Sequence, residues 1–244
     1  MTRALLAAAM LLLVAAPARA QPLVADLSSH LIAITTGFAG TEVLLFGATE
    51  GQGDVVVALR GPESEAVVRR KSRILGIWIN RDEVTFTGVP AFYRVAASDR
   101  IEDIAAPAAR ARHQLGVHYL RLGTRETRPS AEIAMFRDGL LRNKERQELF
   151  ASQVGQVLFL GPRLFSTRFQ LPSNVPTGAY TVEVFLIKDG QVIAAQTTPM
   201  FVSRVGAGAE VYEFAHRRAA SYGILAVLIA VFSGWAAGAL FRRA

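Results

Sequence analysis

The sequence predicts a mainly β protein with a helical insertion: an Ig-like β-sandwich followed by a single C-terminal transmembrane helix. Short β-branched runs alternate with Gly and Pro turns along most of the chain, which is typical of a sandwich. An Ala- and Arg-rich middle segment, residues 106–152, breaks that pattern and favours helices. Near the end, residues 219–241 form one uncharged apolar run, long enough to cross a hydrocarbon core of about 30 Å.

The N-terminal segment, residues 1–20, has the pattern of a secretory signal peptide. Arg3 precedes a short apolar run at residues 4–16, and Ala18-Arg19-Ala20 has the small-residue spacing of a cleavage site. We expect cleavage after Ala20, with an uncleaved anchor as the alternative. Export would place the folded part of the chain in the periplasm.

Residues 21–105 are expected to form the first β-rich half of the periplasmic domain. The run at 54–60 contains three consecutive valines, which indicates a buried strand, and Gly61-Pro62 ends it. Strands are expected at residues 31–35, 42–48, 54–60, 66–69, 73–79, 84–87 and 92–97.

The helical insertion at 106–152 contains two expected helices. The first covers residues 107–115, and the second is capped by Ser130 after Pro129 and runs to about residue 152. In the second, Ile133, Phe136 and Leu140 recur at helical spacing and predict its inner face.

Residues 153–203 are expected to form the second β-rich half. Strands are expected at 154–160, 164–171, 180–188 and 191–198. The last two flank Asp189-Gly190, and a two-residue Asp-Gly connection favours a β-hairpin with a type I′ turn.

The C-terminal part is divided into a juxtamembrane segment at 204–218, a transmembrane helix at 219–241 and a cytoplasmic tail at 242–244. Basic pairs flank the apolar run on both sides, so the positive-inside rule does not orient it. The signal peptide predicts the orientation instead. The expected localisation is the bacterial inner membrane, with a single pass and most of the chain in the periplasm.

The charge distribution argues against a nucleic-acid partner. The formal net charge is +7, but six of the 27 basic residues lie in the signal peptide or beside the apolar run. The remaining domain has 21 basic and 20 acidic residues, without the basic excess of a phosphate binder. Membrane lipid is the simpler partner for the terminal arginines.

Arg69, Lys71 and Arg73 are the candidate ligand-binding residues, together with Trp78. In an extended chain the three cations share one face, with Arg70 opposite, and such a face can hold an oxyanion or carboxylate. A solvated strand edge is the alternative for the cations, and a place in the core is the alternative for Trp78.

No catalytic residue, metal site or cofactor is expected. The sequence contains no cysteine, which excludes disulfides and thiol chemistry, and no hydrolase, zinc-protease or nucleotide-binding fingerprint. The four histidines are scattered along the chain. We therefore expect that the protein is not an enzyme.

Small residues repeat every four positions along the apolar run, at Ala226, Ala230, Gly234 and Gly238. A small-x-x-x-small stripe lets a second helix approach closely, so it could dock a permease or a second copy of this chain. Chance is the alternative, because an Ala-rich span often produces such a stripe.

Several segments together are similar to one known family: residues 38–41, 45–48, 60–62, 69–80, 89–93, 222–223 and 234–235. Through them the chain resembles the putative transmembrane protein family of alphaproteobacteria, which is uncharacterised. The resemblance implies an inner-membrane protein with a periplasmic domain. Genes of that family often lie beside permeases of the sulfite/organosulfonate exporter type, which implies a partner of that class. We expect an accessory or binding subunit of a membrane complex; a periplasmic enzyme with a nonstandard site and an envelope assembly or structural factor are the alternatives.

Overall fold

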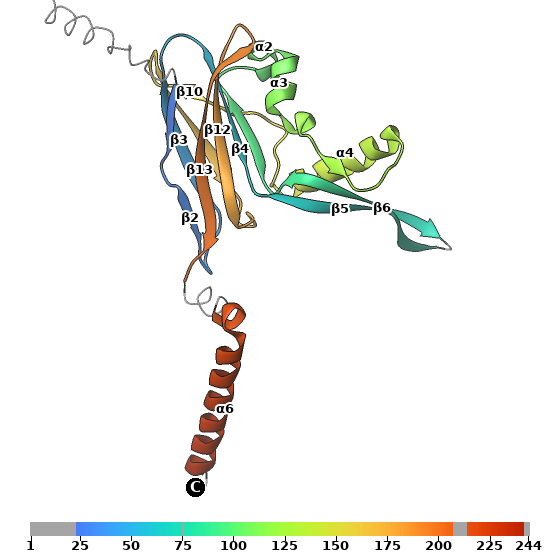
Figure 1. Cartoon of the computed structure of the whole chain (residues 1–244), viewed down its shortest axis with the longest axis vertical. Helices are drawn as coiled ribbons and strands as arrows, with labels where there is room; N and C mark the ends of the chain where they lie inside the picture. The colour runs from blue at the N-terminus through green and yellow to red at the C-terminus, as the bar shows by residue number, and fades with distance from the viewer. Residues whose placement is uncertain (1–22, 75, 207–213, 242–244) are drawn as a thin grey trace, which may run out of the picture.

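The computed structural model describes residues 23–74, 76–206 and 214–241. It contains three β-sheets, a few helices, and one apolar helix at the C-terminal end (Figure 1). The prediction of a mainly β protein is confirmed. An Ig-like sandwich is not shown by the strand order, which includes the parallel pairs β13–β2 and β7–β9. The expected signal peptide at 1–20 and the tail at 242–244 lie outside the described residues.

The first sheet has four antiparallel strands in the order β1-β3-β11-β10. Its buried residues alternate with exposed ones, because one face contributes to the core and the other is solvated. The expected strand at 154–160 is reduced to two short strands, β9 and β10. The strands are β1 (Leu23–Leu27), β3 (Thr41–Thr49), β10 (Leu158–Phe159) and β11 (Leu164–Leu171).

The second sheet has six strands in the order β2-β13-β12-β4-β7-β9. β4 lies in its middle with both faces buried, so the buried strand predicted at 54–60 is confirmed. Two side chains link the two sheets. The amide of Gln196 on β13 bonds the backbone N–H and C=O of Ala25 on β1, and the hydroxyl of Thr167 on β11 donates to the carbonyl oxygen of Gln156 on β9. The strands are β2 (Leu31–Ile34), β4 (Asp54–Arg60), β7 (Tyr93–Ala97), β9 (Gly155–Gln156), β12 (Gly178–Lys188) and β13 (Gln191–Arg204).

The hairpin predicted at Asp189-Gly190 is confirmed. β12 and β13 pair antiparallel on either side of it, from Gly178 opposite Val202 to Lys188 opposite Gln191. Both turn residues have positive φ, 51° for Asp189 and 76° for Gly190, as a type I′ turn requires.

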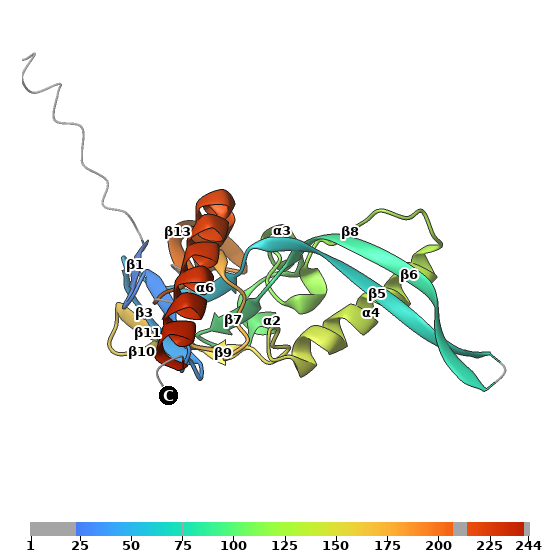
Figure 2. The same cartoon turned by 90° about the horizontal axis from the view of Figure 1, so that it is seen from below.

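The third sheet is a long hairpin, which we call the arm: β5 (Glu63–Ile74) and β6 (Ile77–Pro90), with β8 (Gly123–Thr124) paired to β6 near its root. It projects to one side of the other sheets (Figures 1 and 2). The single strand expected at 73–79 is wrong, because the chain reverses there. Arg73 instead pairs across the arm with Trp78, and Gly76 has a φ of +85°.

Short helices cover one face of the second sheet, and a longer one braces the arm. α2 (Ile101–Ile104), α3 (Pro107–His113) and the 3₁₀ turn η1 (Val117–Tyr119) follow β7. α4 (Ser130–Arg146) packs Phe136, Leu140 and Leu141 into the core beside the arm. It ends earlier than expected; Leu149 and Phe150 leave the helix and are buried in the core.

The apolar helix α6 (Ala219–Phe241) has the bounds predicted for the transmembrane span. Its stretch Ala219–Gly238 is long and apolar enough to cross a membrane, and none of that stretch is buried against the rest of the protein. Within the juxtamembrane segment expected at 204–218, residues 207–213 lie outside the described residues.

Candidate functional site

A polar cleft of about 690 Å³ lies where α3 and η1 meet the end of β4, the facing part of β12 and the root of the arm. We call it the arginine cleft, because Arg60, Arg112 and Arg121 all line it. Its lining also contains the carboxylates of Glu63 and Glu183. Three guanidinium groups against two carboxylates leave a net positive charge.

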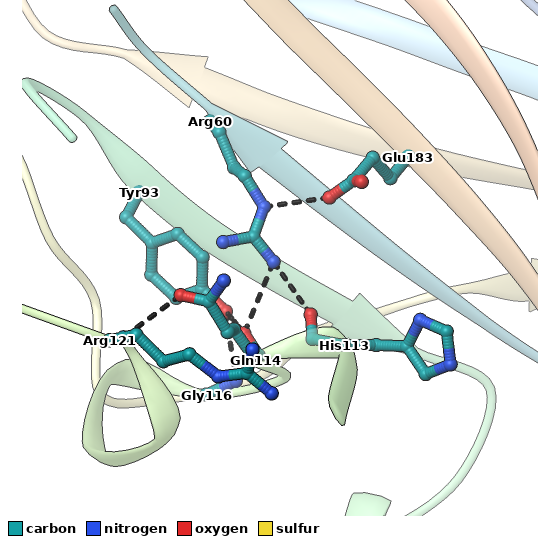
Figure 3. A network of polar contacts seen from close by, with 7 residues as sticks. All are labelled: Arg60, Tyr93, His113, Gln114, Gly116, Arg121 and Glu183. Atoms are coloured by element: carbon teal, nitrogen blue, oxygen red, sulfur yellow. Dashed lines mark hydrogen bonds and ion pairs between the residues drawn. The ribbon is translucent and has the colours of Figure 1, made fainter. Parts of the chain in front are cut away.

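Arg60 lines the cleft and is fixed in place by several contacts. It ends the buried strand β4, and its guanidinium lies over the ring of Tyr93 with 5.3 Å from Cζ to the ring centroid. Nε donates to Oε2 of Glu183 at 2.7 Å, across the pairing of β4 with β12 (Figure 3). The two side chains are 18% and 30% exposed, so water screens this ion pair only in part.

Two arginines satisfy the carbonyl groups at the C-terminal end of α3. Gln114 adopts a left-handed φ of 52° there and turns the chain out of the helix. Nη2 of Arg60 donates to the carbonyl oxygens of His113 at 2.7 Å and Gln114 at 3.3 Å, and Nη2 of Arg121 donates to that of Ala111 at 3.2 Å. Cations at this end also complement the negative end of the helix dipole.

Tyr93 stabilises this turn with two hydrogen bonds. Its hydroxyl donates to the carbonyl oxygen of Gln114 at 2.6 Å and accepts from the backbone N–H of Gly116 at 2.8 Å. Burial raises the pKa of Tyr93 to about 12, because the phenolate would lose its hydration. A neutral hydroxyl with both of these partners positions the cleft and is a poor nucleophile.

His113 contributes its backbone to the cleft, while its side chain points elsewhere. Its imidazole turns away from Arg60 (Figure 3) and lies 5.0 Å from the ring of Phe185 between centroids. Among the residues that the structure describes, no three His, Cys, Asp or Glu side chains converge as a metal site would require.

The cleft retains hydrogen-bond donors that no described residue uses. Arg60 keeps Nη1, Arg121 keeps Nη1 and Nε, and the exposed guanidinium of Arg112 forms no hydrogen bond or ion pair with a described residue. Guanidinium groups bind carboxylates and oxyanions bidentately. The arrangement is therefore suited to binding a small anion.

The candidate residues predicted from sequence lie on the arm, away from this cleft. Arg69, Lys71 and Arg73 alternate along β5 and so share one face, with Trp78 opposite Arg73 on β6. Arg69 pairs with Glu83 at 3.0 Å, and Nε of Arg73 donates to the carbonyl oxygen of Gly76 at 3.2 Å. The alternative that placed Trp78 in the core is wrong, since its exposed fraction is 65%.

The other face of the arm is fixed to α4 by two arginines. Arg70 pairs with Asp82 across the arm, and its guanidinium lies 5.7 Å from the ring centroid of Phe136. Arg128 lies 6.0 Å from the same ring and pairs with Glu132 at 2.9 Å. The hydrogen bond from Arg70 lowers the pKa of Asp82, which favours the ionised pair.

The small-residue stripe on α6 has free space beside it. A Cβ atom added to Gly234 or Gly238 would meet no described atom within 4 Å. Ala226 and Ala230 continue the stripe and are exposed. Bulky exposed side chains, Leu228 and Phe232, lie on the other side of the helix.

Sequence reasoning missed the arginine cleft. The available signal was Arg60, a charged residue directly after a fully apolar strand and directly before Gly61-Pro62. Arg112 and Arg121 carried no comparable signal, because helix-terminal and loop arginines are common on protein surfaces.

A comparison with family models finds one that matches residues 22–243, described as "Putative transmembrane protein (Alph_Pro_TM)". The match covers nearly the whole chain, so the chain belongs to this family, and the resemblance noted from sequence is confirmed. A comparison with curated proteins finds no match.

Proposed function

On the premise of this family membership, we propose that the protein is an anchored accessory or binding subunit of a membrane complex. The folded domain lies in the periplasm, and α6 spans the inner membrane of a bacterium with the C-terminus in the cytoplasm. The partner is a permease, an anion exporter of the sulfite/organosulfonate type. The arginine cleft receives the anion.

The cleft is the observation that carries this proposal. Its unused guanidinium donors suit an oxyanion such as sulfite or the head of a sulfonate. The described groups nearby favour binding over catalysis, since the hydroxyl of Tyr93 is neutral and occupied on both sides. A single apolar helix cannot form a transport pathway, so a role in transport requires another membrane protein.

Anion binding is tested by calorimetry on the full-length protein in detergent, titrated with sulfite and with an alkyl sulfonate. Arg112→Gln should weaken binding at least tenfold, which corresponds to the loss of a charge-assisted contact of about 1.4 kcal/mol or more. Arg142→Gln is the matched control, an exposed arginine on α4 outside the cleft. Absence of binding by the unmodified protein, or equal losses in both variants, would reject the cleft as an anion site.

Partner docking through α6 is tested by purification from native membranes in mild detergent. Gly234→Leu/Gly238→Leu should abolish recovery of the permease, because the added side chains block close helix approach. Ala236→Leu adds similar bulk on the opposite side of the helix and should leave recovery intact. Recovery of the protein alone across several detergents would contradict this docking and would favour a periplasmic enzyme or an envelope factor. Turnover assays would then test for the enzyme, and crosslinking in native membranes would test for the envelope factor.

A further inference from the structure

The free end of the arm, residues 71–81, combines exposed apolar side chains with basic ones. The exposed fractions of Ile77, Trp78 and Ile79 are 69%, 65% and 42%, which is unusual for three consecutive large apolar residues. We call residues 71–81 the arm tip. Most of such an apolar surface remains in contact with water unless something outside the described fold covers it.

The arm tip is positively charged. It contains Lys71, Arg73 and Arg81 and no acidic residue. The nearest carboxylates along the arm are already engaged, because Asp82 pairs with Arg70 and Glu83 pairs with Arg69. Lys71 and Arg73 therefore form no ion pair among the described residues, and Arg81 interacts only with Asp82, which Arg70 already pairs. A surface that covers the arm tip should be anionic.

The arm holds this tip away from the sheets on a braced support. Antiparallel pairing of β5 with β6 continues along the whole arm to Ile74 opposite Ile77. Phe136 of α4 contacts the guanidinium groups of Arg70 and Arg128, so α4 braces the arm from its root as far as Arg70. Figure 1 shows the arm sloping toward the end of the sheets at which β13 ends and the chain continues to α6.

We infer that the arm tip docks on the anionic lipid surface of the membrane that holds α6. Tryptophan is enriched at the interface between water and hydrocarbon, where its ring is apolar and its N–H remains hydrated. Lysine and arginine beside it meet the negative headgroups. The arm tip is a protruding hairpin end with no described cavity, which suits a fluid surface better than a small ligand.

This inference needs only the membrane anchor of the family and is independent of the arginine cleft and of any permease. Docking of the arm tip gives the domain a second attachment to the bilayer, in addition to α6. Two attachments restrict how the domain can tilt over the membrane.

The test uses the full-length Trp235→Phe protein, one copy per lipid nanodisc, so that Trp78 is the only tryptophan. In discs that contain phosphatidylglycerol, lipids brominated near the headgroup should quench Trp78, and aqueous acrylamide should quench it less than it does in detergent. In phosphatidylcholine discs both effects should weaken. Salt should weaken lipid quenching as well, because it screens the attraction.

Charge variants decide whether the arm tip itself is responsible. Each of Lys71→Gln, Arg73→Gln and Arg81→Gln should lower the ratio of docked to undocked arm about fivefold. The matched control Arg142→Gln/Arg163→Gln/Lys188→Gln changes three exposed cations elsewhere and should leave the ratio unchanged. Full exposure of Trp78 to acrylamide in anionic discs, or an equal effect of the control variant, would overturn the inference.

Discussion

Replacement of Arg60 by methionine should destabilise the folded domain by about 3 kcal/mol, although Arg60 lies in a solvent-filled cleft. Methionine keeps an apolar stem over Tyr93 and removes the charge and the donors. The change therefore separates the polar contacts of Arg60 from its packing.

The magnitude follows from the contacts that are lost. Arg60 donates to Glu183 and to the carbonyl oxygen of His113, both at 2.7 Å, and each hydrogen bond from a charged group contributes about 1.5–3 kcal/mol. Water reaches Glu183, whose side chain is 30% exposed, so the penalty for leaving it unpaired is below that of a fully buried charge. We therefore take the lower end of the range for both bonds.

The assay is thermal unfolding of the full-length protein, followed by circular dichroism of the β-sheets. For a domain of this size, about 3 kcal/mol corresponds to a fall in Tm of roughly 6–12 °C. Arg112→Met is the matched control in the same cleft and should change Tm by no more than about 2 °C, because the guanidinium of Arg112 has no described partner. If the two variants shift Tm equally, Arg60 does not hold α3 in the way its contacts indicate.

The remaining predictions concern one buried hydroxyl and three glycines. Folding raises the pKa of Tyr93 from about 10 to about 12, so the hydroxyl loses its proton at a lower pH in the unfolded chain than in the folded protein. The free energy of unfolding should therefore fall as the pH rises from about 10 to 12. Tyr93→Phe should show a smaller fall over this range in urea titrations. Gly47→Ala should lower Tm markedly, since its Cβ would lie 2.5 Å from the Val24 carbonyl oxygen, whereas Gly161→Ala meets no described atom and should be neutral. Gly190→Ala should cost about 1–2 kcal/mol of unfolding free energy, because φ is +76° there.

Local patterns were sufficient for several elements of the fold. Three consecutive valines predicted the buried strand β4, and Asp189-Gly190 predicted the hairpin that follows β12. The bounds of α6 followed from its length and lack of charge. Each of these signals lies within a short window of sequence, so no distant residue is needed to interpret it.

Elements that depend on distant partners were missed or misplaced. The strand β1 is only five residues long, and its Ala25 is bonded by Gln196, which lies far along the chain. α4 was extended too far, because Leu149 and Phe150 leave the helix to pack in the core. Phe150 packs there against the ring of Tyr93, which no local window contains.

For the arm, the sequence predicted a shared face for the cations of β5 but not the exposed hairpin to which they belong. Alternation along an extended chain predicted that Arg69, Lys71 and Arg73 share one face, and the structure places all three on β5, where the pairing shifts register between Arg70 and Lys71. The reversal at Gly76 was hidden because apolar residues continue on both sides of it, which resembles one buried strand. Only the pairing of the two strands reveals that Trp78 belongs to an exposed hairpin end.

The arginine cleft was beyond sequence reasoning for a different reason. Arg60 and Arg121 reach it from a strand and from a loop, and their shared target is a set of backbone carbonyl groups at the end of α3. Every residue has a backbone carbonyl group, so no residue type in the sequence indicates this target.

The same contacts that stabilise the helix end also hold two guanidinium groups in place beside Arg112. A site whose groups are held by structural contacts needs little reorganisation to bind an anion. Arg112 contributes to binding without stabilising the fold, whereas Arg60 contributes to both, so Arg112→Gln should weaken binding without the loss of stability expected for Arg60→Met.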